Sequence, residues 1–123
     1  MSKLTHKEMA ARAKKIAARF YATSRGRRPV REWLLALSRD DRKVIGTDIQ
    51  KVEFGWPIGV PYCRSLSRGL WEVRSDLADQ RMARVIFCIV RGEMVLLHGF
   101  VKKTQKTPAA DLDLAAKRRR EIE

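Results

Sequence analysis

The sequence has few cysteines and histidines and no long apolar run. Of its 123 residues, two are cysteine and two are histidine, whereas a structural zinc site needs about four such ligands at close spacing. We therefore expect no metal and no cofactor, and we expect both cysteines to be small buried apolar residues. The longest wholly apolar runs, such as residues 85–90, are far too short to cross a bilayer. With no apolar signal-peptide region near the N-terminus, these absences predict a cytoplasmic protein with no membrane partner.

Several well-known catalytic patterns are also missing. The chain has no Ser-His-Asp arrangement, no Gly-rich phosphate-binding loop and no pair of histidines for acid–base cleavage of RNA. No single motif therefore names a reaction.

Positive charge is abundant. Lys and Arg number 27 against 14 Asp and Glu, which gives a net charge of +13 and a sequence pI near 10.6. Such an excess draws a protein to polyanions, of which nucleic acid is the commonest, since phosphate contacts supply most non-specific affinity. The length fits one domain. We expect a basic N-terminal extension over residues 1–15 and a single domain over residues 16–123.

The N-terminal third is predicted to contain a strand and a helical hairpin. Residues 1–15 fit either a short helix with a capping box or a frayed basic arm. Residues 16–22 fit either a continued helix or, as we favour, a first strand ending near Thr23. A helix from about residue 30 to 37 starts behind Pro29, and a second helix capped by Ser38 runs to about residue 54. These last two form the hairpin.

The rest of the chain predicts an antiparallel meander and a last helix. Apolar runs joined by Arg-Gly turns indicate four strands, over residues 62–67, 70–75, 82–90 and 93–101. The third of them is apolar on both faces, which indicates a strand covered on both sides. Thr107 is expected to cap the last helix, with Pro108 in its first position. The predicted fold class is α+β, with the hairpin packed on a mainly antiparallel twisted sheet of four to five strands.

Two arginines stand on the predicted strands. Arg74 shares a sheet face with Glu72, so it is either a solvated or Glu-paired arginine or a phosphate clamp whose planar fork matches two phosphate oxygens. Arg84 lies in an apolar run, where a partly buried arginine needs a partner. One interpretation is an internal salt bridge to Glu72, Asp76 or Asp79. We favour the other, in which Arg84 lies beside Arg74 under a ligand phosphate.

A cationic loop follows the last predicted strand. Lys102, Lys103 and Lys106 form a charge run that is usually a solvated loop, yet strand ends are also where sites form on rigid scaffolds. A lysine near other cations can have its pKa lowered enough to move protons near neutrality. His98 alternates with Leu97 and is more typical of a hydrogen-bonded core residue than of a catalyst. The three tryptophans are expected to be core anchors, although Trp71, the one close to Arg74, also fits a base-stacking platform.

Four segments resemble the phage-derived HigB-like branch of the RelE/ParE toxin superfamily. They read GRRPVREWL from residue 26, LSRGLWEVR from residue 66, the strand that starts at Arg84, and LLHGFVKKTQKTP from residue 96. Together they cover roughly residues 16–120. The combination of the second and fourth segments is fairly specific.

The resemblance implies a RelE-type α+β domain that acts as a metal-independent, ribosome-dependent mRNA interferase. Its partners would be mRNA, the ribosome and a cognate antitoxin of the helix-turn-helix type. The family's phosphate-handling residues map onto Arg74, Arg84, Lys102 and Lys103. In that chemistry the ribose 2′-OH attacks the adjacent phosphate, Lys103 or Lys102 serves as base, and His98 or Lys106 is a second-rank candidate for the acid.

This chain departs from some relatives because no tyrosine or histidine follows the cationic loop. Two other functions stay open. ParE-like members of the superfamily inhibit DNA gyrase without cleaving RNA, and a non-catalytic nucleic-acid-binding domain would share the same charge. Cleavage of translated mRNA would distinguish the mRNA interferase from both of these alternatives. DNA damage with intact mRNA would mark the gyrase inhibitor.

Overall fold

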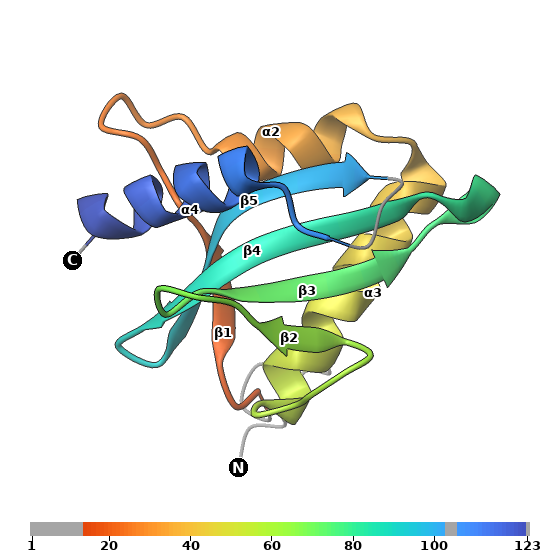
Figure 1. Cartoon of the computed structure of the whole chain (residues 1–123), viewed down its shortest axis with the longest axis horizontal. Coiled ribbons are helices and arrows are strands. Elements are labelled where there is room, and N and C mark those ends of the chain that lie inside the picture. Colours follow the sequence, from red (N-terminus) through yellow and green to blue (C-terminus); the bar gives the residue numbers. More distant parts are fainter. Residues whose placement is uncertain (1–13, 103–105, 123) are drawn as a thin grey trace, which may run out of the picture.

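Five strands form one mixed sheet with helices on both faces, as the computed structural model shows (Figure 1). The structure describes residues 14–102 and 106–122. In chain order the elements are β1 (Ala17–Phe20), α2 (Pro29–Ala36), α3 (Arg39–Gly55), β2 (Cys63–Ser65), β3 (Trp71–Asp76), the 3₁₀ turn η1 (Ala78–Gln80), β4 (Met82–Val90), β5 (Glu93–Lys102) and α4 (Ala109–Glu121). The predicted α+β class, the helical hairpin and the C-terminal helix are confirmed.

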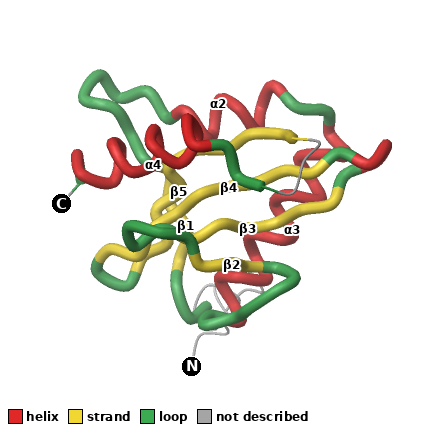
Figure 2. Tube along the Cα trace, viewed as in Figure 1, coloured by secondary structure: helices red, strands yellow, loops and turns green. Residues whose placement is uncertain are grey.

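The sheet order is β1-β5-β4-β3-β2 (Figure 2). All neighbours pair antiparallel except β1, which pairs parallel with β5 from Ala17 opposite Glu93 to Phe20 opposite Leu96. The β4–β5 hairpin turns at Arg91 and Gly92, both with positive φ, as a tight two-residue hairpin turn requires. The first strand ends before the predicted Thr23, although the Tyr21 amide still donates to the Leu96 carbonyl.

The hairpin of α2 and α3 follows from local signals. Pro29 occupies the first turn of α2, where its missing N–H costs nothing. The Ser38 hydroxyl accepts a hydrogen bond from the Asp41 amide at 3.1 Å and so caps α3, as predicted. At the other end of α3, the buried carboxylate of Glu53 accepts from the Ala18 amide at 2.7 Å and lies 3.0 Å from the Lys14 ammonium. Glu53 therefore joins α3 to the start of β1.

The main core lies between the sheet and the α2–α3 layer. Ile45 and Val52 of α3 are fully buried against Val73, Val85 and Phe87 of the sheet. The tryptophans are core anchors, as predicted: Trp56 makes edge contacts with Trp71 at 4.9 Å and with Phe87 at 5.9 Å between ring centroids. The third, Trp33, covers the backbone of Gly99 on β5.

A second core lies on the opposite face, under α4. It contains Ile86, Cys88, Val95 and Leu97 of the two central strands, and α4 contributes mainly Ala115 and Ala116. Alternate residues of β4 thus enter the two cores, which confirms the prediction of a strand covered on both sides. Both cysteines are buried, as expected. Burial raises the pKa of the Cys63 thiol to about 11, with a further contribution from nearby Glu72.

Three local predictions were wrong. The first strand of the meander, predicted over residues 62–67, is confined to Cys63–Ser65, because the loop back to β3 begins at Leu66. Leu97 and His98 do not alternate: the β4–β5 register shifts between Ile86 and Phe87, and both side chains contact the α4 side. Thr107 does not cap α4.

Pro108 is the N-cap residue of α4 and makes no side-chain cap. The Thr107 hydroxyl instead donates to Glu72 on β3. Across the described residues, no helix is both long and apolar enough to span a membrane. The capping box at residues 5–8 lies outside the described residues.

Candidate nucleic-acid interface

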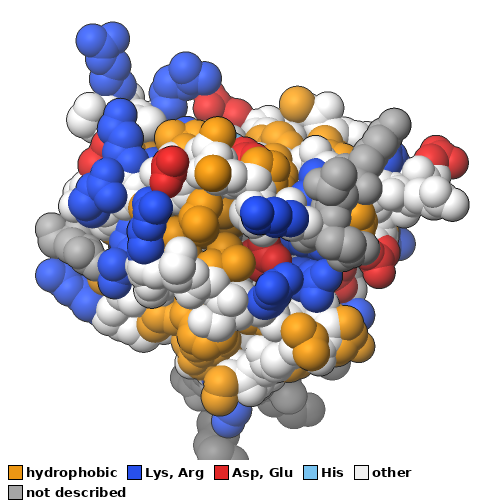
Figure 3. All heavy atoms as spheres, viewed as in Figure 1, with side chains coloured by type: hydrophobic (Ala, Val, Ile, Leu, Met, Phe, Trp, Pro, Cys, Tyr) orange, Lys and Arg blue, Asp and Glu red, His pale blue; other side chains and the backbone are white. Residues whose placement is uncertain are grey.

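Four strands bring basic side chains to the face of the sheet that carries α4. Arg64 of β2 lies opposite Glu72 of β3, and Arg74 of β3 lies opposite Arg84 of β4. Lys102 ends β5 two residues beyond Phe100, which is the partner of Arg84. We call Arg64, Glu72, Arg74, Arg84 and Lys102 the cationic cluster. Figure 3 shows Lys and Arg side chains gathered on this face beside α4.

At the centre of the cluster, Arg84 and Glu72 are buried together. Arg84 is 1% exposed and Glu72 is 0% exposed. Arg84 Nε lies 3.8 Å from Glu72 Oε1, and Arg84 Nη1 donates to the Ala83 carbonyl at 2.9 Å. Burial lowers the pKa of Arg84, and the charge of Glu72 opposes that shift. The internal salt bridge to Glu72, which was one of the two interpretations from the sequence, is therefore present. The interpretation that we favoured, with Arg84 as a phosphate clamp beside Arg74, is wrong, because Arg84 is buried and forms the floor of the cluster.

Lys102 is also buried, at 8% exposed. Burial lowers the pKa of its ammonium, and the positive charges of Arg84, Arg74 and Arg64 lower it further, whereas Glu72 raises it. A lysine so placed has a larger neutral fraction near neutral pH than an exposed one, which is the requirement for accepting a proton.

Beyond the loop, the chain returns to the cluster at Thr107. The Thr107 hydroxyl donates to Glu72 Oε2 at 2.8 Å. This places the preceding residue, Lys106, with Arg64 on a groove of about 390 Å³ that Leu66, Ser67 and Leu112 also line. The groove offers two cations, from β2 and from the segment before α4, and a hydroxyl, a combination that suits a phosphate group.

Arg74 is half-buried, and its amide donates at 2.9 Å to the carbonyl of Tyr62, the residue just before the start of β2. With Tyr62, Asp76 and Asp48 of α3 it lines a hollow of about 250 Å³. Its charge still acts on Arg84 and Lys102. Arg74 therefore belongs to the cluster electrostatically and stands at its margin.

His98 is held by α4. Its Nε2 lies 2.6 Å from Asp111 Oδ1 in the first turn of α4, and its ring stacks on Phe100 at 5.4 Å between centroids. This is the hydrogen-bonded arrangement that a histidine on a covered strand was expected to show. Lys103, by contrast, lies outside the described residues.

The sequence reasoning missed three members of the site. Arg64, Glu72 and Thr107 were not proposed as site residues, although Glu72 was considered as a partner of the arginines. Counting back from a turn centred on Arg68, rather than on the bond between Arg68 and Gly69, would have placed Arg64 opposite Glu72, since paired residues of a hairpin are equidistant from its turn. The Thr107 contact depends on the course of the loop, and no local pattern encodes it.

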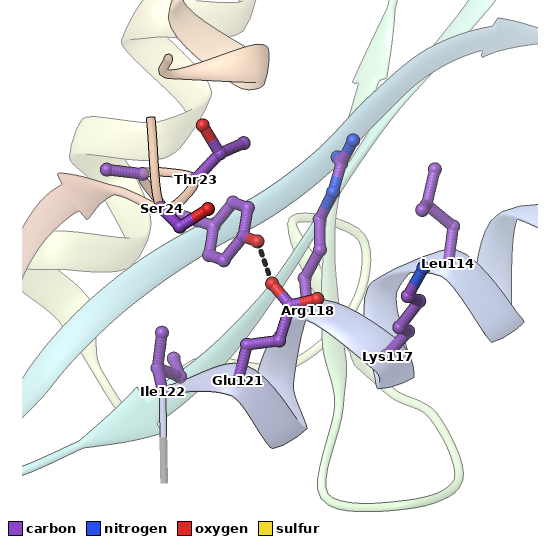
Figure 4. A pocket seen from close by; sticks show the side chains of 9 residues that line it. Thr23, Ser24, Leu114, Lys117, Arg118, Glu121 and Ile122 are labelled. Atoms are coloured by element: carbon purple, nitrogen blue, oxygen red, sulfur yellow. Dashed lines mark hydrogen bonds between the residues drawn. The ribbon is translucent and has the colours of Figure 1, made fainter. Parts of the chain in front are cut away.

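Another hollow lies at the far end of α4, with a volume of about 510 Å³ (Figure 4). The hydroxyl of Tyr21, which follows β1, donates to the Glu121 carboxylate across it. Arg118 lies over the Tyr21 ring and donates to the Leu97 carbonyl at 2.7 Å. The contacts in this hollow fasten α4 to the sheet.

Among the described residues, no group of three or more His, Cys, Asp or Glu side chains is placed to hold a metal ion.

Comparison with known proteins gives one family. A profile described as "Phage derived protein Gp49-like (DUF891)" matches residues 32–120, which include the cationic cluster and most of α4. A search of curated proteins gave no match. The matched region spans well over half of the chain. The chain therefore belongs to the phage-derived Gp49-like family, a family of RelE/HigB-like toxins.

Proposed function

We propose that this protein is the toxin of a type II toxin–antitoxin system and that it cleaves mRNA on the ribosome. The observation that carries the proposal is the cationic cluster, in which four adjacent strands present basic groups to one face and Lys106 lines a groove with Arg64. Family membership supports the toxin role. The HigB-like branch, the interferase activity and the partners (a helix-turn-helix antitoxin, mRNA and the ribosome) belong to the proposal.

The reaction we propose needs no group from outside the protein and RNA. The ribose 2′-oxygen forms a bond to the adjacent phosphorus while the bond from phosphorus to the 5′-oxygen breaks. The products are a 2′,3′-cyclic phosphate and a 5′-hydroxyl. The 2′-hydroxyl proton passes to a base and the 5′-oxygen receives a proton.

The described residues divide these tasks as follows. Arg64 and Lys106 both line the groove and would neutralise the charge that builds up on the phosphorane oxygens. Lys102 is the base we favour, because its lowered pKa gives it a neutral fraction. Lys103 is its alternative from the family resemblance. Arg84 raises the positive potential from below without touching the RNA in this conformation.

The general acid has to donate a proton to the leaving 5′-oxygen. His98 is bonded to Asp111 and would have to leave that contact, whereas Lys106 is exposed and already lines the groove. We therefore place Lys106 before His98 as the proton donor. Positioning by ribosomal RNA would then supply much of the acceleration.

The test is cleavage of a defined mRNA on stalled ribosomes, with new ends mapped by primer extension. Arg64→Ala and Lys106→Ala should reduce the rate at least tenfold each. Lys43→Ala removes one exposed cation from α3 on the other side of the sheet and serves as the matched control. New A-site ends carrying 5′-hydroxyls, lost in the two site variants, are the expected result.

Two outcomes would overturn the proposal. Intact mRNA together with inhibited gyrase would assign the chain to the ParE-like function. Intact mRNA and uninhibited gyrase, with salt-dependent RNA binding retained, would leave a non-catalytic binding domain.

A further inference from the structure

The described residues contain one buried carboxylate at the centre of the cationic cluster. Glu72 is fully buried on β3 and lies opposite Arg64 of β2. The charges of Glu72 and Arg74 also act on Arg84 and Lys102. Burying an ionised carboxylate is costly unless it is paired and hydrogen-bonded. The two carboxylate oxygens of Glu72 have different partners here, and this difference points to two separate roles.

Oxygen Oε1 faces Arg84, whose Nε is 3.8 Å away. This is the charge-compensating half, and it needs nothing from the loop. Oxygen Oε2 accepts the Thr107 hydroxyl at 2.8 Å. That bond adds no charge to the cluster, so charge compensation alone does not explain it.

The bond from Thr107 to Glu72 fixes the position at which the chain returns to the sheet after the cationic loop. Lys102 is held by its place in β5, opposite Met82 of β4. Thr107 is held on β3, beyond β4 in the sheet order. The residue before Thr107 is Lys106, which faces the groove, and the strand partner of Glu72 is Arg64, which lines the same groove. One carboxylate is therefore connected to the positions of both groove cations.

We propose that Glu72 is a positioning residue that, through the Thr107 hydroxyl, keeps Lys106 on the groove that Arg64 also lines, so that the two bind one RNA phosphate. The proposal rests on the proposed function, because it takes RNA as the ligand of the groove. It does not require that the RNA be cleaved. The charged groups that face Glu72 are Arg64 from β2, Arg74 from β3, Arg84 from β4 and Lys102 from β5, and the test leaves all four in place.

Thr107→Val separates positioning from charge. Valine has nearly the shape of threonine but no hydroxyl, so the variant breaks the tether and keeps every charge. The probe is a short single-stranded RNA with 2′-O-methyl groups, which cannot be cleaved by 2′-oxygen attack. Its affinity is measured by fluorescence anisotropy at several salt concentrations. Each lost phosphate contact lowers the slope of log affinity against log salt by about 0.7 for single-stranded nucleic acid.

We expect Thr107→Val to reduce the slope by about one contact and to weaken binding on the order of threefold to tenfold at low salt. Lys106→Ala should do the same, and the double variant should be no worse than Lys106→Ala alone, since the tether acts through Lys106. Thr47→Val is the matched control, because Thr47 is exposed on α3 and the substitution is the same. It should leave the slope unchanged.

Glu72→Gln tests the role of the negative charge of Glu72, which compensates Arg84. The amide oxygen still accepts from Thr107, so the slope should stay close to that of the unchanged protein if the variant folds. Thermal unfolding shows whether each variant folds. If Glu72→Gln does not fold, the result for Thr107→Val decides whether the proposal holds.

Three results would overturn the proposal: an unchanged slope in Thr107→Val, an additive loss in the double variant, or no salt-dependent RNA binding by the unchanged protein. Tethered binding together with intact mRNA on ribosomes would uphold the role of Glu72 while removing the interferase. The two proposals therefore fail separately.

Discussion

Replacing Gly99 by alanine tests the packing of α2 on the sheet. A methyl group built on Gly99 would lie 2.4 Å, 2.5 Å and 2.9 Å from three ring atoms of Trp33, whereas carbon atoms in contact prefer about 3.5–4.0 Å. The indole would have to move by about 1 Å or leave its place. Such overpacking costs about 1–3 kcal/mol. For a chain of this length that corresponds to a fall in Tm of about 4–12 °C.

The assay is thermal and urea unfolding of Gly99→Ala beside Gly46→Ala. Gly46 lies in α3 with no atom within 4 Å of the added methyl, so its replacement should raise stability by up to about 1 kcal/mol through helix propensity. In a Trp33→Leu background, the cost of Gly99→Ala should shrink by more than about 1 kcal/mol, as direct contacts are non-additive. A Gly99→Ala protein within about 0.5 kcal/mol of the unchanged one would refute this placement of Trp33.

Three further predictions concern polar groups. Two hydrogen bonds from Arg81, at 2.7 and 3.0 Å, lower the pKa of Asp41. The pair therefore stabilises the fold above the ordinary aspartate pKa, and this stabilisation is lost as the pH falls through the lower pKa of the folded state. Asp41→Asn should flatten the acid side of a stability–pH curve. The hydrogen bond to Glu121 raises the pKa of Tyr21, so its contribution is complete below the ordinary tyrosine pKa and is lost as the pH rises through the folded value; Tyr21→Phe should remove that alkaline loss and cost about 1–3 kcal/mol at neutral pH in urea unfolding. The buried Ser75 hydroxyl has no hydrogen-bond partner, so Ser75→Ala should leave the urea midpoint unchanged or raise it slightly, and a loss above about 1 kcal/mol would contradict the structure.

The elements of this fold could be predicted from the sequence because their signals are local. Pro29 and Ser38 mark helix starts, and the glycine at position 92 marks a hairpin with the correct register near the turn. The alternation along residues 82–90 gave both faces of the central strand. In each case, the physical cause lies within a few residues of the signal.

The details of the site escaped prediction because they depend on distant partners. Nothing near His98 signals the bulge that turns it toward α4. Thr107 has the sequence pattern of a helix cap, but a buried carboxylate 35 positions earlier takes its hydroxyl. Whether Arg84 was a clamp or the floor of the cluster depended on how deeply Glu72 was buried beside it. These are tertiary facts that outweigh local preference.

The parallel pairing of β1 with β5 has a consequence for synthesis of the chain. Ala17 pairs with Glu93 and Phe20 with Leu96, so β1 has no partner strand until β5, which lies far along the chain, has been synthesised. Closing so long a loop is entropically slow compared with forming the helical hairpin. A nascent chain still attached to the ribosome that makes it cannot complete the sheet until β5 has emerged. Assembly of the cationic cluster waits for the same event, because Lys102 lies at the end of β5.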